Sequence, residues 1–425
     1  MDKTALIVSP FFPPSALAGV HRARHLAKHL PAAGWRPIVV CVDERFHEQR
    51  LDLSLAMLVP ASVKIEKTPA AAIGLTRPFG LGDISLRAWF PLKKAIAAQL
   101  KAHPGATTLI TGSPFYPMAL AGWIKRRFGG PVVLDFQDPW LSAWGARFPA
   151  ASKGGAVHRI SALLEPRALR NADYVTSVSP VHNAEMAQRY PWFDARRMAA
   201  IPIGCDRDDF SVAPGGHGPT FHEDGRFELS YVGAYWPAAE KPVRAFLRAL
   251  RSLKERRAEL PQRLRVNFIG TDPTLNAAQS HVAAFAAQYG VSDCIREMPA
   301  RLPYLQALAA MKASDALLMI GSDEAHYTAS KIYPALMSGR PYLAIFHAES
   351  SATAILRRAG GGLVVSFSDA DDIDLRVDEM AQALERVVDE AASFGPAEPA
   401  VFREFEADAI ARRFAAVFDA AAIRR

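Results

Sequence analysis

The chain alternates short apolar runs with longer amphipathic runs, and this alternation is typical of parallel β-sheets whose faces are covered by helices. In the first half, apolar runs of strand length predict strands. These strands are residues 4–9, 37–42, 108–111, 131–135, 174–179 and 197–202. Runs with helical periodicity between them predict helices at 20–30, around 117–128 and near 160–171.

The same alternation begins again after residue 225. The stretch 211–225 is rich in Gly, Pro and His and has no periodicity, so we expect it to be a linker. The strands predicted beyond it are 228–232, 265–270, 316–320, 342–346 and 362–366. The helices predicted there are 241–257, 276–289, 302–313, one that runs through Arg358 and two that finish the chain. We therefore predict an α/β protein with two Rossmann-like, doubly wound domains, 1–205 and 226–400.

The length and composition agree with this division. One hydrophobic core rarely serves 425 residues, and a chain that is half hydrophobic and 22% charged is ordinary for a globular protein. No apolar run approaches the roughly 18–20 residues of a membrane span, and the first apolar run is too short for a signal peptide. Cys41, Cys205 and Cys294 form no CxxC pair, which favours a reducing compartment. We expect a cytoplasmic protein.

The net charge of +7 favours an anionic partner. No Lys/Arg block or nucleic-acid-reading motif is visible, so we expect no nucleic acid. Segment 75–101 contains a single acid, Asp83, and mixes apolar side chains with cations. The apolar ones include Phe79, Leu81, Trp89 and Phe90, and the cations are Arg77, Arg87, Lys93, Lys94 and Lys101. This mixture suits an anionic membrane surface, although an amphipathic helix that buries its aromatics has the same pattern.

The loop after the first predicted strand ends in Gly19, just before the helix 20–30. A glycine there lets a ligand approach the backbone, and the carboxyl ends of strands are where open α/β sheets bind ligands. The loop is not a GxGxxG fingerprint, so we expect no dinucleotide cofactor. His21 and Arg22, next to Gly19, are further candidates for ligand contact.

His21, His25 and His29 recur at intervals of four and share one helix face. A metal site needs a further converging ligand and usually a nearby carboxylate, and this helix offers neither. We therefore expect a solvated basic face and no metal ion.

A second candidate site is segment 327–341, Tyr-Thr-Ala-Ser-Lys-Ile-Tyr-Pro-Ala-Leu-Met-Ser-Gly-Arg-Pro. Lys331 stands in a βα connection beside a probable helix start, where a cation and free amides can hold a diphosphate. Proline is favoured at the first position of a helix, so Pro334 is predicted to start it. Lys331 would then lie in the loop, and Ala335 and Leu336 would offer free amides.

Several short motifs occur one after another along nearly the whole chain. They are residues 13–22, 112–114, 135–140, 172–179, 201–210, 231–233 and 330–341. Their order and spacing resemble bacterial glycosyltransferases of the GT-B fold, in the family-4-like group that builds cell-surface polysaccharides. The resemblance implies an acceptor-binding domain (1–205), a donor-binding domain (226–400) and a last helix, within 401–425, that crosses back onto the first domain. It also implies a nucleotide sugar as substrate, no cofactor and no metal, because enzymes of this fold stabilise the departing diphosphate with protein cations and helix dipoles.

On the acceptor side, the segment Asp135-Phe136-Gln137-Asp138-Pro139-Trp140 follows the apolar residues 131–134 of a predicted strand. An Asp at the carboxyl end of the sheet can orient or deprotonate a sugar hydroxyl, and this makes Asp138 the leading candidate. An Asp before Pro is also a common turn starter. Asp135 is expected to be structural, and Trp140 either stacks on a sugar or fills the core.

The candidate site residues are then as follows. The catalytic candidates are Asp138 and Lys331; the donor-binding candidates are Gly19, Gly233, Lys241, Tyr327, Ser330, Lys331 and Tyr333; the acceptor-binding candidates are His21, Arg22, Asp138 and Trp140.

The sequence departs from the family pattern where the donor ribose is usually held. The Glu that commonly stands three residues after this Lys is Pro334 here, and the earlier carboxylate position is His326. Ribose recognition would then need Tyr327, Tyr333 or Glu324.

Two further departures concern charge. The Arg that the family often has after the strand 228–232 is Ala234 here, and Lys241 is followed by Pro242 where the family has Gly. The Asp369-Ala370-Asp371 match to a metal-binding DxD motif is attributed to a helix start, where acids favour the dipole.

We therefore predict a metal-independent glycosyltransferase of the hexosyltransferase type in exopolysaccharide or related polysaccharide biosynthesis. It would move a sugar from a UDP- or GDP-linked donor to a lipid-linked or polysaccharide acceptor, at the cytoplasmic face of the membrane as a peripheral protein. The resemblance suggests retention at the anomeric carbon. The alternative is a non-catalytic GT-B protein that binds sugar nucleotides or acts as a scaffold, for which degenerate motifs are typical. A UDP-sugar epimerase of the same fold would require more acids and histidines.

Overall fold

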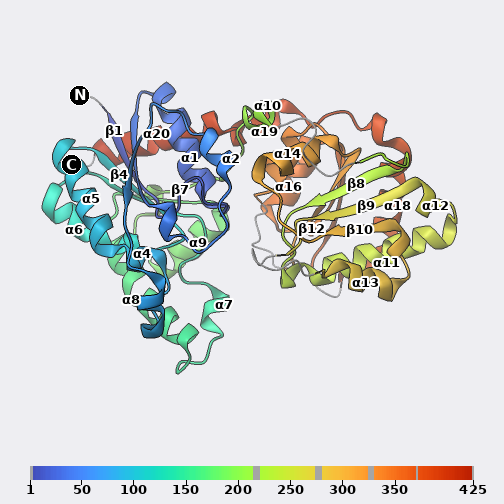
Figure 1. Ribbon diagram of the computed structural model, residues 1–425, viewed down its shortest axis with the longest axis horizontal. Helices are drawn as coiled ribbons and strands as arrows, with labels where there is room; N and C mark the ends of the chain where they lie inside the picture. Colours follow the sequence, from blue (N-terminus) through green and yellow to red (C-terminus); the bar gives the residue numbers. More distant parts are fainter. Residues whose placement is uncertain (1–2, 214–220, 273–279, 324–329, 370–371, 424–425) are drawn as a thin grey trace. The chain divides into compact units, whose positions relative to one another are not determined.

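The computed structural model describes the chain except residues 1–2, 214–220, 273–279, 324–329, 370–371 and 424–425 (Figure 1). The chain forms two compact units, Met1–Ile203 with Ala407–Arg425 and Gly204–Glu406. Each unit is built on one parallel sheet, of seven strands in the first and six in the second. The predicted fold class, α/β with two Rossmann-like domains, is confirmed.

The N-terminal unit has the strand order β3-β2-β1-β4-β5-β6-β7, with every neighbouring pair parallel. The strands are β1 Thr4–Val8, β2 Arg36–Val42, β3 Lys64–Thr68, β4 Thr107–Gly112, β5 Val132–Phe136, β6 Tyr174–Ser177 and β7 Met198–Ala200. The sequence does not predict β3, because its residues KIEKT form no apolar run. As an edge strand it needs no apolar run on both faces.

Helices cover both faces of this sheet. They are α1 Val20–His29, α2 Leu53–Met57, α3 Ile73–Thr76, α4 Ile84–Arg87, α5 Trp89–Ala102, α6 Ala121–Phe128, α7 Ala143–Ala146, α8 Lys153–Leu169, α9 Pro180–Arg189 and α20 Ala407–Ile423, with short 3-10 turns η1 Leu30–Ala33, η2 Glu44–Phe46, η3 Arg77–Phe79, η4 Tyr116–Leu120 and η5 Ala195–Arg197. One core joins α1 to α20 through Leu26, Phe414 and Phe418, and the other includes Leu92 of α5 and Ile124 of α6. The return of the last helix to the first domain is therefore confirmed.

The C-terminal unit has the order β10-β9-β8-β11-β12-β13, again parallel throughout. Its strands are β8 Phe227–Val232, β9 Leu264–Ile269, β10 Ile295–Met298, β11 Ala316–Ile320, β12 Tyr342–His347 and β13 Gly362–Phe367. Its helices are α10 Asp209–Val212, α11 Glu240–Arg256, α12 Leu260–Arg263, α13 Val282–Tyr289, α14 Tyr304–Ala313, α15 Ile332–Met337, α16 Ser351–Ala359, α17 Asp372–Leu375, α18 Val377–Glu390 and α19 Pro399–Phe402, with η6 Pro237–Ala239, η7 Ser292–Cys294, η8 Ala391–Ser393 and η9 Arg403–Phe405. The sequence does not predict β10, a half-buried edge strand whose residues IREM include two charges.

Because all strands of each sheet are parallel, their carboxyl ends share one edge, and the loops there are the natural place for a ligand. In the N-terminal unit these loops contain Gly19 after β1 and Asp138 after β5. In the C-terminal unit they contain Gly233 after β8 and Arg301 after β10.

One buried ion pair connects most of the N-terminal unit. The Nε of Arg22 in α1 donates to Asp135 Oδ2 of β5 at 3.1 Å, and neither side chain is exposed. The other guanidinium nitrogens donate to the carbonyl oxygens of Pro202, at 2.7 Å, and Ile201. The guanidinium carbon lies 4.8 Å from the Phe414 ring centroid in α20. The pair therefore joins α1, the sheet, the strand-end segment 201–202 and the terminal helix.

Asp135→Ala should destabilise the N-terminal unit severely. The substitution leaves the Arg22 guanidinium buried without its carboxylate, which costs about 3–5 kcal/mol, and the Tm should fall by about 10 °C. Thermal unfolding followed by calorimetry measures the change. The double variant Arg22→Met/Asp135→Leu removes both charges and should lose less than Asp135→Ala; an equal or larger loss would contradict a role for the unpaired charge.

Candidate functional site

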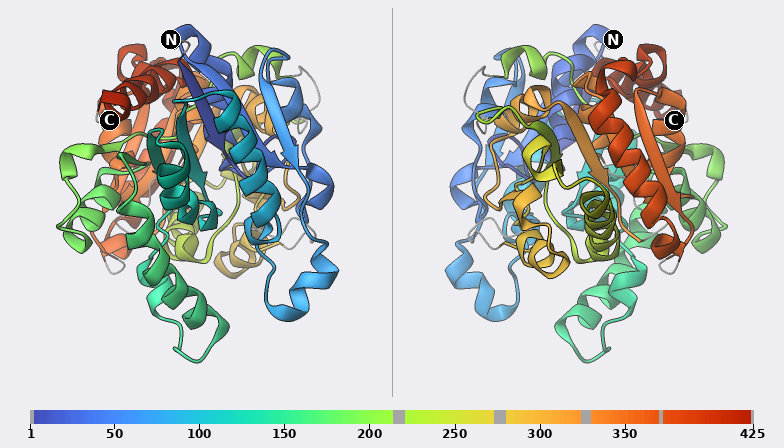
Figure 2. Two further views of the ribbon diagram at one scale, coloured as in Figure 1. Left: turned by 90° about the vertical axis from the view of Figure 1, so that its left-hand side faces the viewer. Right: turned by 90° about the vertical axis from the view of Figure 1, so that its right-hand side faces the viewer.

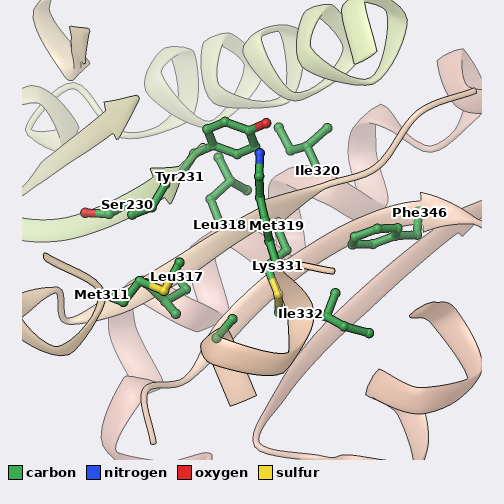
Figure 3. Close-up of a pocket in the computed structure, with 12 residues that line it drawn as sticks. Ser230, Tyr231, Met311, Leu317, Leu318, Met319, Ile320, Lys331, Ile332 and Phe346 are labelled. Atoms are coloured by element: carbon green, nitrogen blue, oxygen red, sulfur yellow. The ribbon is translucent and has the colours of Figure 1, made fainter. Parts of the chain in front are cut away.

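Lys331 stands directly before α15, and its side chain extends to the end of β8 (Figure 3). Its Nζ is 5.4 Å from the centroid of the Tyr231 ring and donates a long hydrogen bond, 3.4 Å, to the carbonyl oxygen of Ala234. The Tyr231 hydroxyl donates to the same oxygen at 2.8 Å. One carbonyl group and one aromatic face therefore hold the ammonium group at the carboxyl edge of the C-terminal sheet.

Gly233 provides the space for this lysine. Its φ of +151° lies in the region that favours glycine, and its N–H donates to Ile269 O at 2.8 Å. A Cβ atom at this position would lie 2.0 Å from Lys331 Nζ and 2.4 Å from its Cε. Any other residue at 233 would therefore displace the cation.

Arg301 is a second cation at the same edge, and sequence reasoning missed it. It follows β10, and the absent Cβ of Gly270 would lie 3.7 Å from its Cα and Cδ. Burial, and to a smaller extent the positive charge of Arg301, lower the pKa of Lys331 to about 7. Burial also lowers the pKa of Arg301. Among the described residues, no carboxylate forms an ion pair with either cation.

Two neighbouring cations without carboxylate partners favour a multiply charged anion. The sequence signal for Arg301 was weak, because it follows a strand that the pattern does not predict.

A small cavity of about 30 Å³ adjoins Lys331. Its lining comes from β8, β11, β12, α14 and α15, and includes Ser230, Tyr231, Met311, Met319 and Phe346 (Figure 3). Such a volume holds one or two water molecules and no nucleotide. An anion must therefore reach Lys331 from the open edge of the sheet.

The helix after Lys331 differs from the sequence prediction. It begins at Ile332, so Pro334 is its third residue and does not start it. The Ala335 N–H donates to Lys331 O at 3.2 Å and is not free. Pro334 is tolerated because the first-turn N–H that it lacks has no intrahelical acceptor. With only six residues, α15 contributes no anion site of its own, and the charge of Lys331 carries the interaction.

Tyr333 is another correction. Its side chain is buried, and its ring centroid is 5.0 Å from that of Phe405. It packs in the interior of the C-terminal unit because it is the second residue of α15, on the face turned toward η9, and it does not present a group to a ribose. Ser330 is half-buried in the turn before Lys331. Tyr327, Glu324 and His326 lie outside the described residues.

Lys241 is exposed in the first turn of α11, beside Glu240, which pairs with Arg244. The structure gives no contact between Lys241 and Lys331, so its role in donor binding remains a prediction. Of the possible DxD motif, Asp369 accepts a hydrogen bond from the Asp372 N–H at 2.8 Å, and the rest lies outside the described residues.

On the N-terminal sheet, Gln137 is a residue that sequence reasoning did not single out. Its Nε2 donates to the Gly19 carbonyl oxygen at 3.2 Å and to Thr111 Oγ1 at 2.7 Å. The Thr111 hydroxyl donates in turn to Asp135 Oδ2 at 2.7 Å. Both amide hydrogens are therefore used, and this fixes the orientation of the amide. Its Oε1 is buried, with no hydrogen-bond partner among the described residues.

Gly19 is the N-cap of α1, and a Cβ there would lie 3.2 Å from Gln137 Oε1. The glycine therefore lets Gln137 tie the first βα loop to the loop that carries Asp138.

Asp138 is exposed, and the surrounding protein raises its pKa by desolvation. A carboxylate with a raised pKa at a sheet edge is suited to accept a proton. Three residues later, the Leu141 N–H donates to Glu165 Oε2 at 3.2 Å, which anchors the loop to α8. Trp140 is buried, stacked at 5.7 Å on the Phe115 ring, and so fills the core instead of offering a sugar-binding face.

The structure also changes the interpretation of Arg22 and His21. Arg22 is fully buried in its pair with Asp135, so the expected contact with an acceptor is wrong. As the third residue of α1, Arg22 faces the sheet and not the surface. His21 is half-buried, with Nδ1 3.2 Å from an Arg24 nitrogen and its ring 5.8 Å from that of His25. Burial, and then the charge of Arg24, lower the pKa of His21. The three histidines do not form the solvated face that the pattern predicts, because His25 is buried.

The described residues contain no group of three His, Cys, Asp or Glu side chains that could hold a metal ion. No helix in the described ranges is long and apolar enough to cross a bilayer.

Residues 18–204 match the model of a family described as glycosyl transferase 4-like domain. The matched residues span most of the N-terminal unit. No curated protein sequence matches the chain significantly.

Solved structures match over both units. An α,α-trehalose-phosphate synthase from Burkholderia vietnamiensis is 13% identical with a TM-score of 0.65, covering 100% of each chain. HepE of Anabaena, in complex with UDP and glucose, is 15% identical with a TM-score of 0.61, covering 98% of this chain and 99% of its own. WaaG, a glycosyltransferase involved in lipopolysaccharide biosynthesis, is 15% identical with a TM-score of 0.56, covering 97% and 95%. The predicted resemblance to a family-4-like glycosyltransferase of the GT-B fold is confirmed.

Gly233→Ala should separate the lysine from the end of β8. The new Cβ would occupy the place of Lys331 Nζ, and the affinity of the protein for UDP should fall about tenfold, equivalent to about 1.4 kcal/mol. Titration calorimetry with UDP measures the loss. Gly290→Ala is the matched control, because Gly290 has a φ of +69° and nothing within 4 Å of the added methyl. Unchanged UDP affinity in Gly233→Ala would contradict the proposed contact.

Binding of UDP-glucose should weaken as the pH rises through about 7. A buried lysine with a lowered pKa is neutral above that value, and a bound diphosphate favours the charged form, so the affinity should fall by up to about tenfold per pH unit above it. The diphosphate of UDP-glucose does not itself titrate in this range.

Calorimetry in buffers of different ionisation enthalpy measures the accompanying proton uptake. Lys331→Met should lose the uptake and, because it removes a buried charge, raise the Tm of the free protein. Proton uptake that persists in Lys331→Met would assign it to another group.

Proposed function

We propose that the protein transfers a hexose from a nucleoside-diphosphate sugar to a lipid-linked or polysaccharide acceptor in cell-surface polysaccharide biosynthesis. The observation that carries the proposal is the pair of cations at the carboxyl edge of the C-terminal sheet, Lys331 and Arg301, neither of which forms an ion pair with a carboxylate among the described residues. The solved structures with UDP and glucose and with a lipopolysaccharide role support the same donor and acceptor classes.

Each unit has a separate part in the proposed reaction. When the bond between the anomeric carbon and the diphosphate oxygen breaks, negative charge grows on the leaving group, and Lys331 and Arg301 stabilise it without a metal ion. The attacking acceptor oxygen bonds to the anomeric carbon. Asp138 orients that hydroxyl and can take its proton. Retention of configuration is the outcome that the resemblance suggests.

The donor nucleotide is UDP or GDP in this proposal, and phosphate dominates its recognition. Pro334 has no side-chain oxygen for a ribose, and Tyr333 is buried, so two of the expected ribose contacts are absent from the described residues.

That gap also favours a second candidate, a GT-B protein that binds the nucleotide sugar without turning it over. Such a protein would keep the two cations, because they serve binding, and would have no need for Asp138.

Thermal-shift screening with UDP-, GDP- and dTDP-sugars tests the donor site. A donor at about 100 times its Kd stabilises the folded state by about 2.7 kcal/mol, which raises the Tm by about 5–10 °C. Lys331→Ala should lose this shift. Lys312→Ala, an exposed lysine of the same unit, should keep it. No shift with any nucleotide sugar would overturn the donor site.

Turnover distinguishes the two candidates. Release of nucleoside diphosphate in the presence of a membrane extract containing lipid-linked acceptors indicates transfer, and Asp138→Asn should slow it by about 10²–10⁴-fold. Asp419→Asn in α20 is the control of equal charge change. Full activity of Asp138→Asn would remove Asp138 from catalysis, and donor binding without release would favour the non-catalytic protein.

A further inference from the structure

The loop between β8 and α11, residues 233–239, carries an exposed tryptophan close to Lys331. The Ala234 carbonyl oxygen in this loop accepts the hydrogen bond from Lys331 Nζ. Trp236 follows two residues later, so its Cα is at most about 7 Å from that of Ala234. Its side chain is 51% exposed. An aromatic ring at the carboxyl edge of the C-terminal sheet therefore lies near the position proposed for the diphosphate.

Backbone hydrogen bonds fix the loop on both sides of Trp236. On one side, the Tyr235 N–H donates to the Thr271 carbonyl oxygen, after β9, at 2.8 Å. On the other side, the Ala238 carbonyl oxygen accepts from the Asp323 N–H, after β11, at 3.0 Å. The ends of the two neighbouring strands therefore hold the backbone that carries the tryptophan, and little conformational freedom is left for a ligand to restrict.

The conformation of the loop directs Trp236 outward. Its φ of −120° and ψ of 146° are extended, as favoured for a residue before proline, here Pro237. Successive side chains of an extended segment point to opposite sides. Tyr235 is buried, with its ring stacked at 5.3 Å on His281 and 6.2 Å from Phe285 of α13, the helix beside α11 (Figure 2). Since Tyr235 points into the unit, Trp236 points away from it.

A single exposed apolar side chain is ordinary on a protein surface, so exposure alone does not mark Trp236. Trp192 of the N-terminal unit is 46% exposed, and its ring lies 5.5 Å from that of Tyr190 and 5.2 Å from Arg170 Cζ. Trp236 has no such ring or cation contact among the described residues. A fixed aromatic face next to a buried cation is suited to a ligand that joins a flat ring to phosphate groups.

The chemistry of the loop favours a nucleobase over a hexose. Residues 234–239 are Ala, Tyr, Trp, Pro, Ala and Ala. Apart from the indole N–H and the buried Tyr235 hydroxyl, their side chains offer no hydrogen-bonding group. A covered hexose needs partners for several hydroxyl groups, whereas a base can be bound through its π face alone.

We propose that Trp236 stacks on the nucleobase of the donor, as a second recognition element besides the cations that hold the diphosphate. This assignment rests on the proposed function, because it takes the bound anion to be a nucleoside diphosphate. The stacking supplies affinity where Pro334 offers no side-chain oxygen to the ribose. Every base has a π face, so the contact accepts uracil and guanine alike.

Titration calorimetry of the full chain with UDP, GDP and inorganic pyrophosphate tests the assignment. Trp236→Ala should weaken the binding of UDP and GDP about tenfold, because it removes the stacked ring. It should leave the affinity for pyrophosphate, which has no base, unchanged. Lys331→Ala should weaken the binding of all three, because it removes the charge.

Trp236→Phe separates stacking from a structural role of the tryptophan. Phenylalanine keeps an aromatic face, so this variant should retain most of the UDP affinity. The quenching of intrinsic tryptophan fluorescence by UDP should nevertheless decrease in Trp236→Phe, because the indole that contacts the base is gone. Trp192→Ala is the matched control and should bind UDP like the wild type. Both tryptophans are exposed, so an unchanged Tm verifies that the variants fold.

Unchanged affinity of Trp236→Ala for UDP and GDP, or an equal loss for pyrophosphate, would overturn the stacking. A loss confined to UDP-glucose, with UDP unchanged, would also overturn it and would assign Trp236 to the hexose. Pyrophosphate distinguishes this failure from failure of the donor site: if it binds to the wild type and not to Lys331→Ala, the cation site stands without the stacking. If neither a nucleotide nor pyrophosphate binds, both proposals are wrong.

Discussion

The N-terminal unit depends on the buried pair of Arg22 and Asp135. A buried charge is tolerated only when its partners are complete, and here the carboxylate accepts from Arg22, from Thr111 and, at 2.7 Å, from Thr176. The same network continues from Thr111 to Gln137 and so to the loop of Asp138. A buried ion pair is thus connected by hydrogen bonds to the residues at the sheet edge that precede Asp138.

The buried cation of the C-terminal unit has fewer partners than Arg22 among the described residues. Lys331 lies against the end of β8, beside Arg301, and donates one long hydrogen bond to a carbonyl oxygen; no carboxylate of the described residues pairs with it. This arrangement lowers the stability of the free protein and raises its affinity for an anion, because binding supplies the missing charge. Gly233 makes the arrangement possible, since only a residue without a Cβ leaves room for the lysine.

The fold class could be predicted from the sequence, because buried parallel strands appear as apolar runs. Most of these strands were predicted. The edge strands β3 and β10 carry charges and were not predicted. Arg301 was missed for the same reason, because it follows β10. Site residues were harder, because spacing does not tell which side of a short helix faces the core. Arg22, Trp140 and Tyr333 all lie close to the carboxyl edges of the sheets, but their side chains are buried. Gly233 and Lys331 were identified, but their contact was not, because it joins two strand ends about a hundred residues apart.

Arg22 and Lys331 show how a structural cation differs from a functional one when both are removed from water. The guanidinium has its carboxylate, two carbonyl groups and an aromatic ring, and a ligand could add nothing to it. The Lys331 ammonium has one weak acceptor among the described residues. Its loss of hydration is therefore not compensated until an anion binds. From the family pattern, both Arg22 and Lys331 were predicted to contact a ligand. The number of hydrogen-bond and charge partners distinguishes the two residues. It supports Lys331 as the residue that contacts the proposed diphosphate, even though Pro334 stands where the usual motif has a carboxylate.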